Sequence, residues 1–350
     1  MNISIVGAAG EVGRALALHL LRGGLLGPSD RLQLVGHGHE AGERKLLAER
    51  SDLLDAFDET APTIEIAGEP EEVSGDVIAI AGGATLGGSI VERRQLAEAN
   101  RALFEAFGKA VAEHGTGREL VVIVTNPVEL GVEIISRCID RHRVLGMGAQ
   151  QDSLRFARAI AADVGLRRDK VHAWVCGEHG AAQVPLWSSI RIRGVEVTAA
   201  ELRGLRRGPR TERFGDELRA HQTSIRELLL ADRVKGAFDA VQALPPDLRA
   251  AIEPFVTFHC LHSTPSATAN ATCDVIRAVQ SGREAVVGAQ VRLDGEFRGF
   301  RTTIGLPVLV DSSGWTAVVC PQLSESEEVE LDTAAGAIGQ NLAEWTSGPA

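Results

Sequence analysis

Short apolar runs recur through the first half of the chain, and longer stretches with helical character separate them. The predicted strands are Ile3–Val6, Leu32–Val35, Val77–Ala81, Leu120–Val124 and Val144–Leu145. Helices are predicted over Arg14–Leu21 and Gln95–Glu113. Almost wholly apolar strands that alternate with helices are typical of a parallel sheet covered on both faces. The pattern therefore predicts a doubly wound α/β domain over residues 1–146.

A glycine turn joins the first predicted strand to the first predicted helix. Its residues run from Gly7 to Gly13, and Gly7, Ala9, Gly10, Val12 and Gly13 are the candidate cofactor contacts. A strand, such a turn and a helix form the Rossmann dinucleotide-binding fingerprint, in which the helix N-terminus faces the pyrophosphate. Ala9 stands at the second glycine position of the fingerprint, where its methyl group leaves slightly less space for the pyrophosphate. A glycine turn of another α/β protein is the alternative.

The end of the second predicted strand bears on the choice of cofactor. Enzymes that select NAD carry an acidic residue there, which binds the ribose 2′-hydroxyl. Here Gly36 and His37 follow the strand, and His39, Arg44 and Lys45 lie close behind. A 2′-phosphate would meet no carboxylate, so we expect NAD(P) binding with NADP favoured over NAD. The alternative is a loop that contacts no ligand.

Composition limits the classes of protein that remain. Hydrophobic residues make up 44% of the chain and charged residues 24%, as in an ordinary globular protein. A formal net charge of −11 speaks against nucleic acid and anionic membranes as partners. Five scattered cysteines suggest neither a disulfide framework nor a zinc site. Because a strand starts directly at the N-terminus, we expect no signal peptide and a cytoplasmic protein.

Several short motifs occur in the order found in one family. They are Val124–Val128, Arg143–Gly146, Gln151–Phe156, Gly177–Gly180, Val184–Ser188 and Ile304–Val308. Together they resemble the lactate/malate dehydrogenase family, of which this chain looks like a divergent member. The resemblance implies an α+β substrate domain over residues 147–350. It also implies an NAD(P)-dependent oxidoreductase that interconverts 2-oxoacids and 2-hydroxyacids, and a homodimer or homotetramer.

Residue chemistry and the resemblance point to the same catalytic set. Reduction of a 2-oxoacid needs a proton donor, and His179 suits this role because imidazole titrates near neutral pH. Asp152 suits the orientation of His179, and Arg155 suits a bidentate carboxylate clamp. The resemblance assigns these roles to the same positions. It also assigns carbonyl polarisation to Arg93, substrate and nicotinamide contacts to Asn126, and a pocket position to Thr264.

Two departures from the family bear on the substrate. The predicted lid, Ala81–Arg93, has Thr85 or Gly87 where malate dehydrogenases carry an arginine for the distal carboxylate. A buried second carboxylate needs a cation. We therefore expect a 2-oxoacid with a neutral side chain, whose pocket Leu86 and Ile90 could line. The second departure is extra length within residues 195–254, which we interpret as a tolerated surface insertion.

Three alternatives stay open at this stage. The chain could be a malate dehydrogenase whose distal clamp comes from Arg94 or from the insertion. It could belong to the metal-dependent, NAD-using glycosidase branch, for which Cys176 is the only indication; otherwise we expect no metal. It could also be a non-catalytic paralogue that binds a dinucleotide or a partner protein. Retention of Arg93, Asp152, Arg155 and His179 argues against this last alternative.

Overall fold

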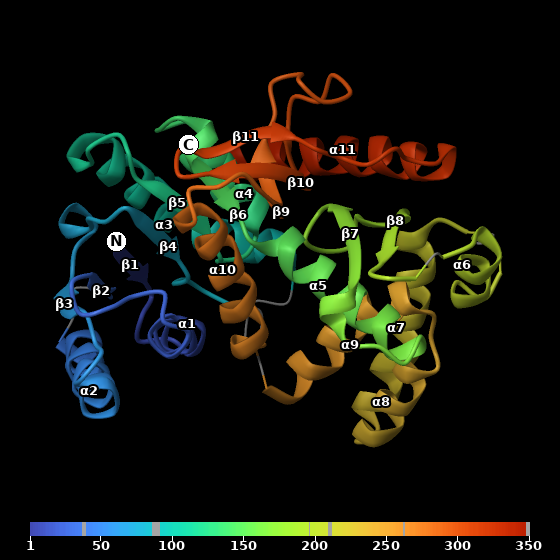
Figure 1. Ribbon diagram of the computed structural model, residues 1–350, viewed down its shortest axis with the longest axis horizontal. Coiled ribbons are helices and arrows are strands. Elements are labelled where there is room, and N and C mark those ends of the chain that lie inside the picture. Colours follow the sequence, from blue (N-terminus) through green and yellow to red (C-terminus); the bar gives the residue numbers. More distant parts are fainter. Residues whose placement is uncertain (37–39, 86–91, 196, 209–211, 262, 348–350) are drawn as a thin grey trace.

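The computed structural model describes residues 1–350 except 37–39, 86–91, 196, 209–211, 262 and 348–350 (Figure 1). His37 and His39 of the predicted cofactor loop lie outside the described residues. So do Leu86, Gly87 and Ile90 of the predicted lid.

The first domain is a parallel sheet with the strand order β3-β2-β1-β4-β5-β6. This is the doubly wound order that the apolar runs predict. The central strands β4 and β5 are wholly apolar because both faces of the sheet are covered there, whereas β1, β2 and β3 also carry polar residues. The strands are β1 (Asn2–Val6), β2 (Arg31–Val35), β3 (Thr63–Ala67), β4 (Val77–Ile80), β5 (Leu120–Ile123) and β6 (Val144–Gly146).

Helices connect these strands across both faces of the sheet. They are α1 (Glu11–Arg22), α2 (Glu40–Phe57), α3 (Arg93–His114) and α4 (Val128–Ile135), with short 3-10 turns at Pro70–Glu72 and Arg141–Arg143. The two predicted helices are confirmed, and each extends a few residues beyond its predicted ends. At α1 the extra residues reach back into the glycine turn, which brings the helix N-terminus to the edge of the sheet.

The sheet continues into the second half of the chain, where the pairing becomes antiparallel. Gly146 of β6 pairs with Gln290, and the order then runs β9-β10-β7-β8, with β11 on β10. These strands are β7 (Val171–Gly177), β8 (Gln183–Ile192), β9 (Ala285–Arg292), β10 (Thr303–Asp311) and β11 (Gly314–Val318). Helices α5 (Gly148–Asp163), α10 (Pro265–Gln280) and α11 (Glu325–Thr346) pack on them, and Arg168–Lys170 is a 3-10 turn. The predicted α/β domain followed by an α+β domain is confirmed.

Four helices form a lobe at one end of the second half (Figure 1). They are α6 (Ala199–Leu205), α7 (Phe214–Leu230), α8 (Val234–Gln242) and α9 (Pro246–Leu261). Helices α7 to α9 bury a core of their own that includes Phe214, Leu218 and Ile252. Helix α9 also packs along α5, which carries Asp152 and Arg155. Our interpretation of residues 195–254 as a mere surface insertion is therefore wrong, because part of the segment packs against the helix that carries the candidate catalytic residues.

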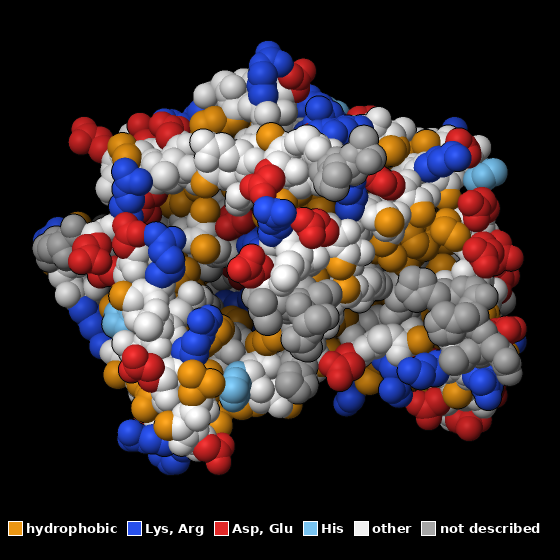
Figure 2. All heavy atoms as spheres, turned by 180° about the vertical axis from the view of Figure 1, so that it is seen from behind, with side chains coloured by type: hydrophobic (Ala, Val, Ile, Leu, Met, Phe, Trp, Pro, Cys, Tyr) orange, Lys and Arg blue, Asp and Glu red, His pale blue; other side chains and the backbone are white. Residues whose placement is uncertain are grey.

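Among the residues that the structure describes, no helix is long and apolar enough to cross a membrane. Acidic and basic side chains are interspersed over the face shown in Figure 2.

Candidate active site

Two cavities meet between the domains and form one trough. The first, of about 480 Å³, is lined by the glycine turn, the end of β2 and Lys45 of α2. The second, of about 360 Å³, reaches from Asn126 to Arg155 and His179. Val12, the Ala81–Gly83 segment, Thr85 and Ser263 line both. The trough thus joins a compartment at the glycine turn to a compartment that holds the candidate catalytic residues.

The glycine turn has the geometry that a dinucleotide requires. Gly7 has φ +81°, and a Cβ there would lie 2.2 Å from the Cα of Gly82. At Gly13 a Cβ would lie 2.3 Å from the Gly7 carbonyl oxygen. Gly10 is the N-cap of α1 and no side chain caps the helix, so its first N–H groups remain available for an anion. These features fit a pyrophosphate.

The other predicted cofactor residues lie around this turn. Ala9, Gly10, Val12 and Gly36 line the first cavity, whereas Gly13 packs behind the turn. Lys45 lines the same cavity and supplies a cation near the end of β2. Asn126 lines the second cavity, and its backbone carbonyl accepts a hydrogen bond of 2.7 Å from Asn100 Nδ2.

Asp152 joins His179 to Arg155. Its Oδ2 lies 2.7 Å from His179 Nδ1, and its Oδ1 accepts a hydrogen bond of 3.1 Å from Arg155 Nη1. Burial by itself would raise the pKa of Asp152, but His179 and then Arg155 outweigh it and hold the pKa below its ordinary value of 3.8. The ionised carboxylate can only accept hydrogen bonds, so Nδ1 carries a proton and Nε2 is left for proton transfer.

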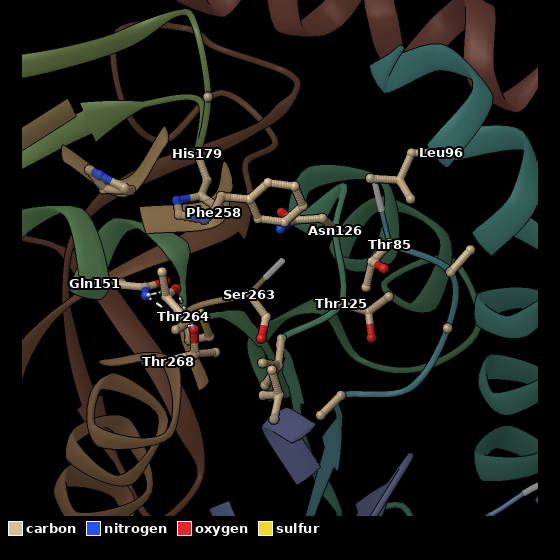
Figure 3. A pocket seen from close by; sticks show the side chains of 18 of the residues that line it. Thr85, Leu96, Thr125, Asn126, Gln151, His179, Phe258, Ser263, Thr264 and Thr268 are labelled. Carbon is tan, nitrogen blue, oxygen red and sulfur yellow. Dashed lines mark hydrogen bonds between the residues drawn. The ribbon is translucent and has the colours of Figure 1, made fainter. Parts of the chain in front are cut away.

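Arg155 is held at the floor of the second cavity. Burial lowers the pKa of Arg155, and the attraction of Asp152 opposes this shift. Its Nη2 lies 3.3 Å from Thr264 Oγ1. Gln151, which sequence reasoning missed, donates to the hydroxyls of Thr264 and Thr268 at 3.4 and 3.1 Å (Figure 3). The predicted Thr264 thus belongs to a polar group around the arginine.

Arg93 lies at the first turn of α3 and also lines the second cavity. Its guanidinium binds two buried carboxylates, those of Glu129 at 2.8 Å and Glu178 at 3.3 Å. Neither glutamate was identified from the sequence, because each lies far from Arg93 along the chain. Arg94, which we considered as an alternative clamp, is instead largely exposed and pairs with Glu98 and Glu344.

Helix α9 supplies an apolar wall. Pro254 and Phe258 line the second cavity, as do His179 and Asn126 (Figure 3). A further cavity of about 240 Å³ lies behind His179 and Asp152 and is lined in part by Leu218 and Gln222 of α7. Residues of the inserted segment therefore border the candidate catalytic residues on two sides.

Comparison with known proteins is consistent with this geometry. A model of the lactate/malate dehydrogenase NAD binding domain matches residues 1–146, and a model of the family's α/β C-terminal domain matches residues 150–207. The chain belongs to the lactate/malate dehydrogenase family. Membership makes it an oxidoreductase of the malate and lactate dehydrogenase type.

Relatives in this family match nearly the whole chain. An L-2-hydroxycarboxylate dehydrogenase (NAD(P)(+)) of Methanocaldococcus jannaschii is 28% identical, with 93% of each chain covered. A malate dehydrogenase of Halobacterium salinarum is 27% identical, with 95% of this chain and 96% of the relative covered. The malate dehydrogenase structure from Cryptosporidium parvum has a TM-score of 0.76 at 22% identity and covers 99% of both chains, which shows the shared fold.

Proposed function

We propose that this protein is a 2-hydroxyacid dehydrogenase that transfers a hydride between a nicotinamide dinucleotide and a 2-oxoacid. The observation that carries the proposal is the Asp152-linked pair of His179 and Arg155 at the end of a trough that begins at a dinucleotide-binding turn. The names of the relatives from Methanocaldococcus jannaschii and Halobacterium salinarum support the same reaction class.

Each residue has a defined role in this reaction. A bound reduced nicotinamide supplies the hydride. Arg155 binds the substrate carboxylate through N–H groups that Asp152 and Thr264 leave free. His179 donates its proton from Nε2 to the carbonyl oxygen, while Asp152 stabilises the charged ring. Arg93 polarises the carbonyl, and Asn126 contacts the substrate and the nicotinamide ribose.

The second part of the proposal is that the substrate side chain is neutral. Among the described residues that line the second cavity, the permanent cations are Arg93 and Arg155, and the proposal already assigns Arg155 to the first carboxylate and Arg93 to the carbonyl. Leu96, Pro254 and Phe258 offer apolar surface instead. A second substrate carboxylate would be buried without a dedicated cation, which is costly.

Comparison of kcat/KM for oxaloacetate with values for pyruvate and for branched or aromatic 2-oxoacids tests the preference. We expect the neutral acids to be preferred. A preference of about tenfold or more for oxaloacetate, roughly 1.4 kcal/mol, would favour a malate dehydrogenase with a non-standard clamp.

The third part is that NADP is favoured over NAD. The support is a glycine, Gly36, at the end of β2 and the cation of Lys45 in the same cavity. Lys45→Ala should weaken NADPH binding and leave NADH binding nearly unchanged. Gly36→Asp should shift the preference toward NADH. Because a Cβ at Gly36 would lie 2.7 Å from Leu46 Cδ1, Gly36→Ala is the matched control for the steric change. A wild-type protein that strongly prefers NADH would refute this part.

Assembly, domain boundary and location complete the proposal. We propose a cytoplasmic homodimer or homotetramer, with domains at residues 1–146 and 147–350. Light scattering on the purified protein measures the assembly, and a monomer would contradict it.

The glycosidase alternative receives no support from Cys176. Its thiol is buried, and burial followed by interaction with Cys320 raises its pKa well above the ordinary value. Cys176 is not among the residues that line the two cavities of the trough, where the candidate catalytic residues lie.

A further inference from the structure

Arg93 is held in a socket formed by helix α4, the loop that follows β7, and helix α11. Its Nη2 lies 2.8 Å from Glu129 Oε2, and its Nη1 lies 3.3 Å from Glu178 Oε1. The Trp345 ring of α11 lies 6.0 Å from the guanidinium carbon. Glu129 and Glu178 are only 1% and 6% exposed, so these are interactions of buried charges. They differ from a surface pair, which contributes little.

Glu129 binds a second group that belongs to the candidate catalytic site. Its Oε1 accepts a hydrogen bond of 2.6 Å from the backbone N–H of His179. One carboxylate therefore connects the guanidinium of Arg93 to the backbone of the candidate proton donor. Glu129 lies in the first turn of α4, which begins at Val128, two residues after Asn126. The positions of Arg93, Asn126 and His179 are thereby coupled through one turn.

Gly180 leaves the space that the guanidinium occupies. A Cβ at Gly180 would lie 1.7 Å from Arg93 Nη1, so a side chain here would displace the end of the arginine. Glu178 stabilises the same turn, because its Oε2 accepts a hydrogen bond of 3.1 Å from the N–H of Ala182.

We propose that Glu129 is a positioning residue for the reaction proposed above: with Glu178, it holds Arg93 at a fixed place relative to His179. The inference rests on the proposed function. In the described part of the chain, two buried carboxylates share the single positive charge of Arg93. If Arg93 withdrew, both buried carboxylates would lose its positive charge, which is costly. This cost keeps the arginine in the socket. Its remaining N–H groups serve the substrate carbonyl, since a guanidinium has five.

Glu129→Gln tests the proposal, because it removes the charge and keeps an oxygen that can accept the His179 N–H. We expect kcat to fall about ten- to a hundredfold, the loss typical of a charge-assisted hydrogen bond, with cofactor affinity unchanged. Glu133→Gln is the matched control. Glu133 is also buried on α4 but pairs with Arg137 and Arg292 away from the cavity. This control should lower thermal stability and leave kcat unchanged.

A double-mutant cycle separates positioning of Arg93 from a general structural role. In an Arg93→Ala background, Glu129→Gln should cause little further loss of kcat. Wild-type kcat in Glu129→Gln, or an equal loss in both backgrounds, would overturn the proposal. If Glu129→Gln does not fold, Gly180→Ala displaces the same guanidinium without removing a charge. Normal kcat in a folded Gly180→Ala variant would also overturn it. A wild-type protein that reduces no 2-oxoacid would refute the proposed function itself, which is a separate result.

Discussion

Replacement of Arg155 by alanine should abolish productive capture of the substrate. The guanidinium uses one N–H for Asp152 and one for Thr264, at 3.1 and 3.3 Å. Of its five N–H groups, three remain, and a bidentate carboxylate needs two. Arg155→Ala thus removes the clamp and also leaves Asp152 buried with His179 as its remaining ionic partner.

The size of the effect follows from the burial of this pair. Removal of one partner of a buried ion pair costs about 3–5 kcal/mol, and each 1.4 kcal/mol is a factor of ten. We therefore expect kcat/KM to fall by about two orders of magnitude or more. Arg155→Lys should fall between wild type and Arg155→Ala, because an ammonium keeps the charge without the planar fork.

Steady-state kinetics with the best 2-oxoacid measure kcat/KM for wild type and for each variant. Titration with cofactor shows that each variant is folded. Arg158→Ala is the matched control, since Arg158 lies one turn further along α5, is mostly exposed and pairs with Glu253. That surface pair should contribute at most about 1 kcal/mol. If Arg155→Ala lowered kcat/KM by less than about fivefold, the carboxylate clamp would have to lie elsewhere.

Three further predictions follow from the same site. His179→Asn should bind cofactor normally and lose about 10²- to 10⁴-fold in turnover; wild-type turnover in this variant would rule out its role as proton donor. Because the folded protein lowers the pKa of Asp152, this carboxylate stabilises the fold above its ordinary value of 3.8, and the stabilisation is lost as pH falls through the lower folded value. Urea unfolding at falling pH should therefore show a smaller acid loss for Asp152→Asn than for wild type, and equal losses would contradict the assignment. Phe258→Arg places a cation in the apolar wall and should raise kcat/KM for oxaloacetate relative to pyruvate, whereas Phe258→Leu should not; an unchanged ratio would remove Phe258 from the side-chain pocket.

Local patterns explain why much of the fold was predictable. Strands buried on both faces are mostly apolar, so β4 and β5 stand out in the sequence. The glycine turn is equally visible, because Gly7 and Gly13 meet backbone atoms that leave no space for a Cβ. Asp152 and Arg155 lie three apart on one helix and His179 falls in a family motif, so the resemblance was enough to propose them as site residues, and the structure brings the three together.

The contacts around Arg93 could not be predicted in this way. Its partners Glu129 and Glu178 lie on other elements, and nothing local marks either as buried. The prediction of a surface insertion within residues 195–254 failed for a related reason. No helix was predicted within this segment, and only tertiary packing shows that α7 and α9 border the candidate catalytic residues.

The most direct test of the central claim is oxidation of NADPH and NADH by the purified protein with a panel of 2-oxoacids, with His179→Asn measured in parallel. We predict that at least one neutral 2-oxoacid is reduced by the wild type, that NADPH is the better donor, and that the variant binds cofactor but scarcely turns over. A wild-type protein that binds the dinucleotide yet reduces none of these acids would contradict the proposed function and favour a non-catalytic, dinucleotide-binding paralogue.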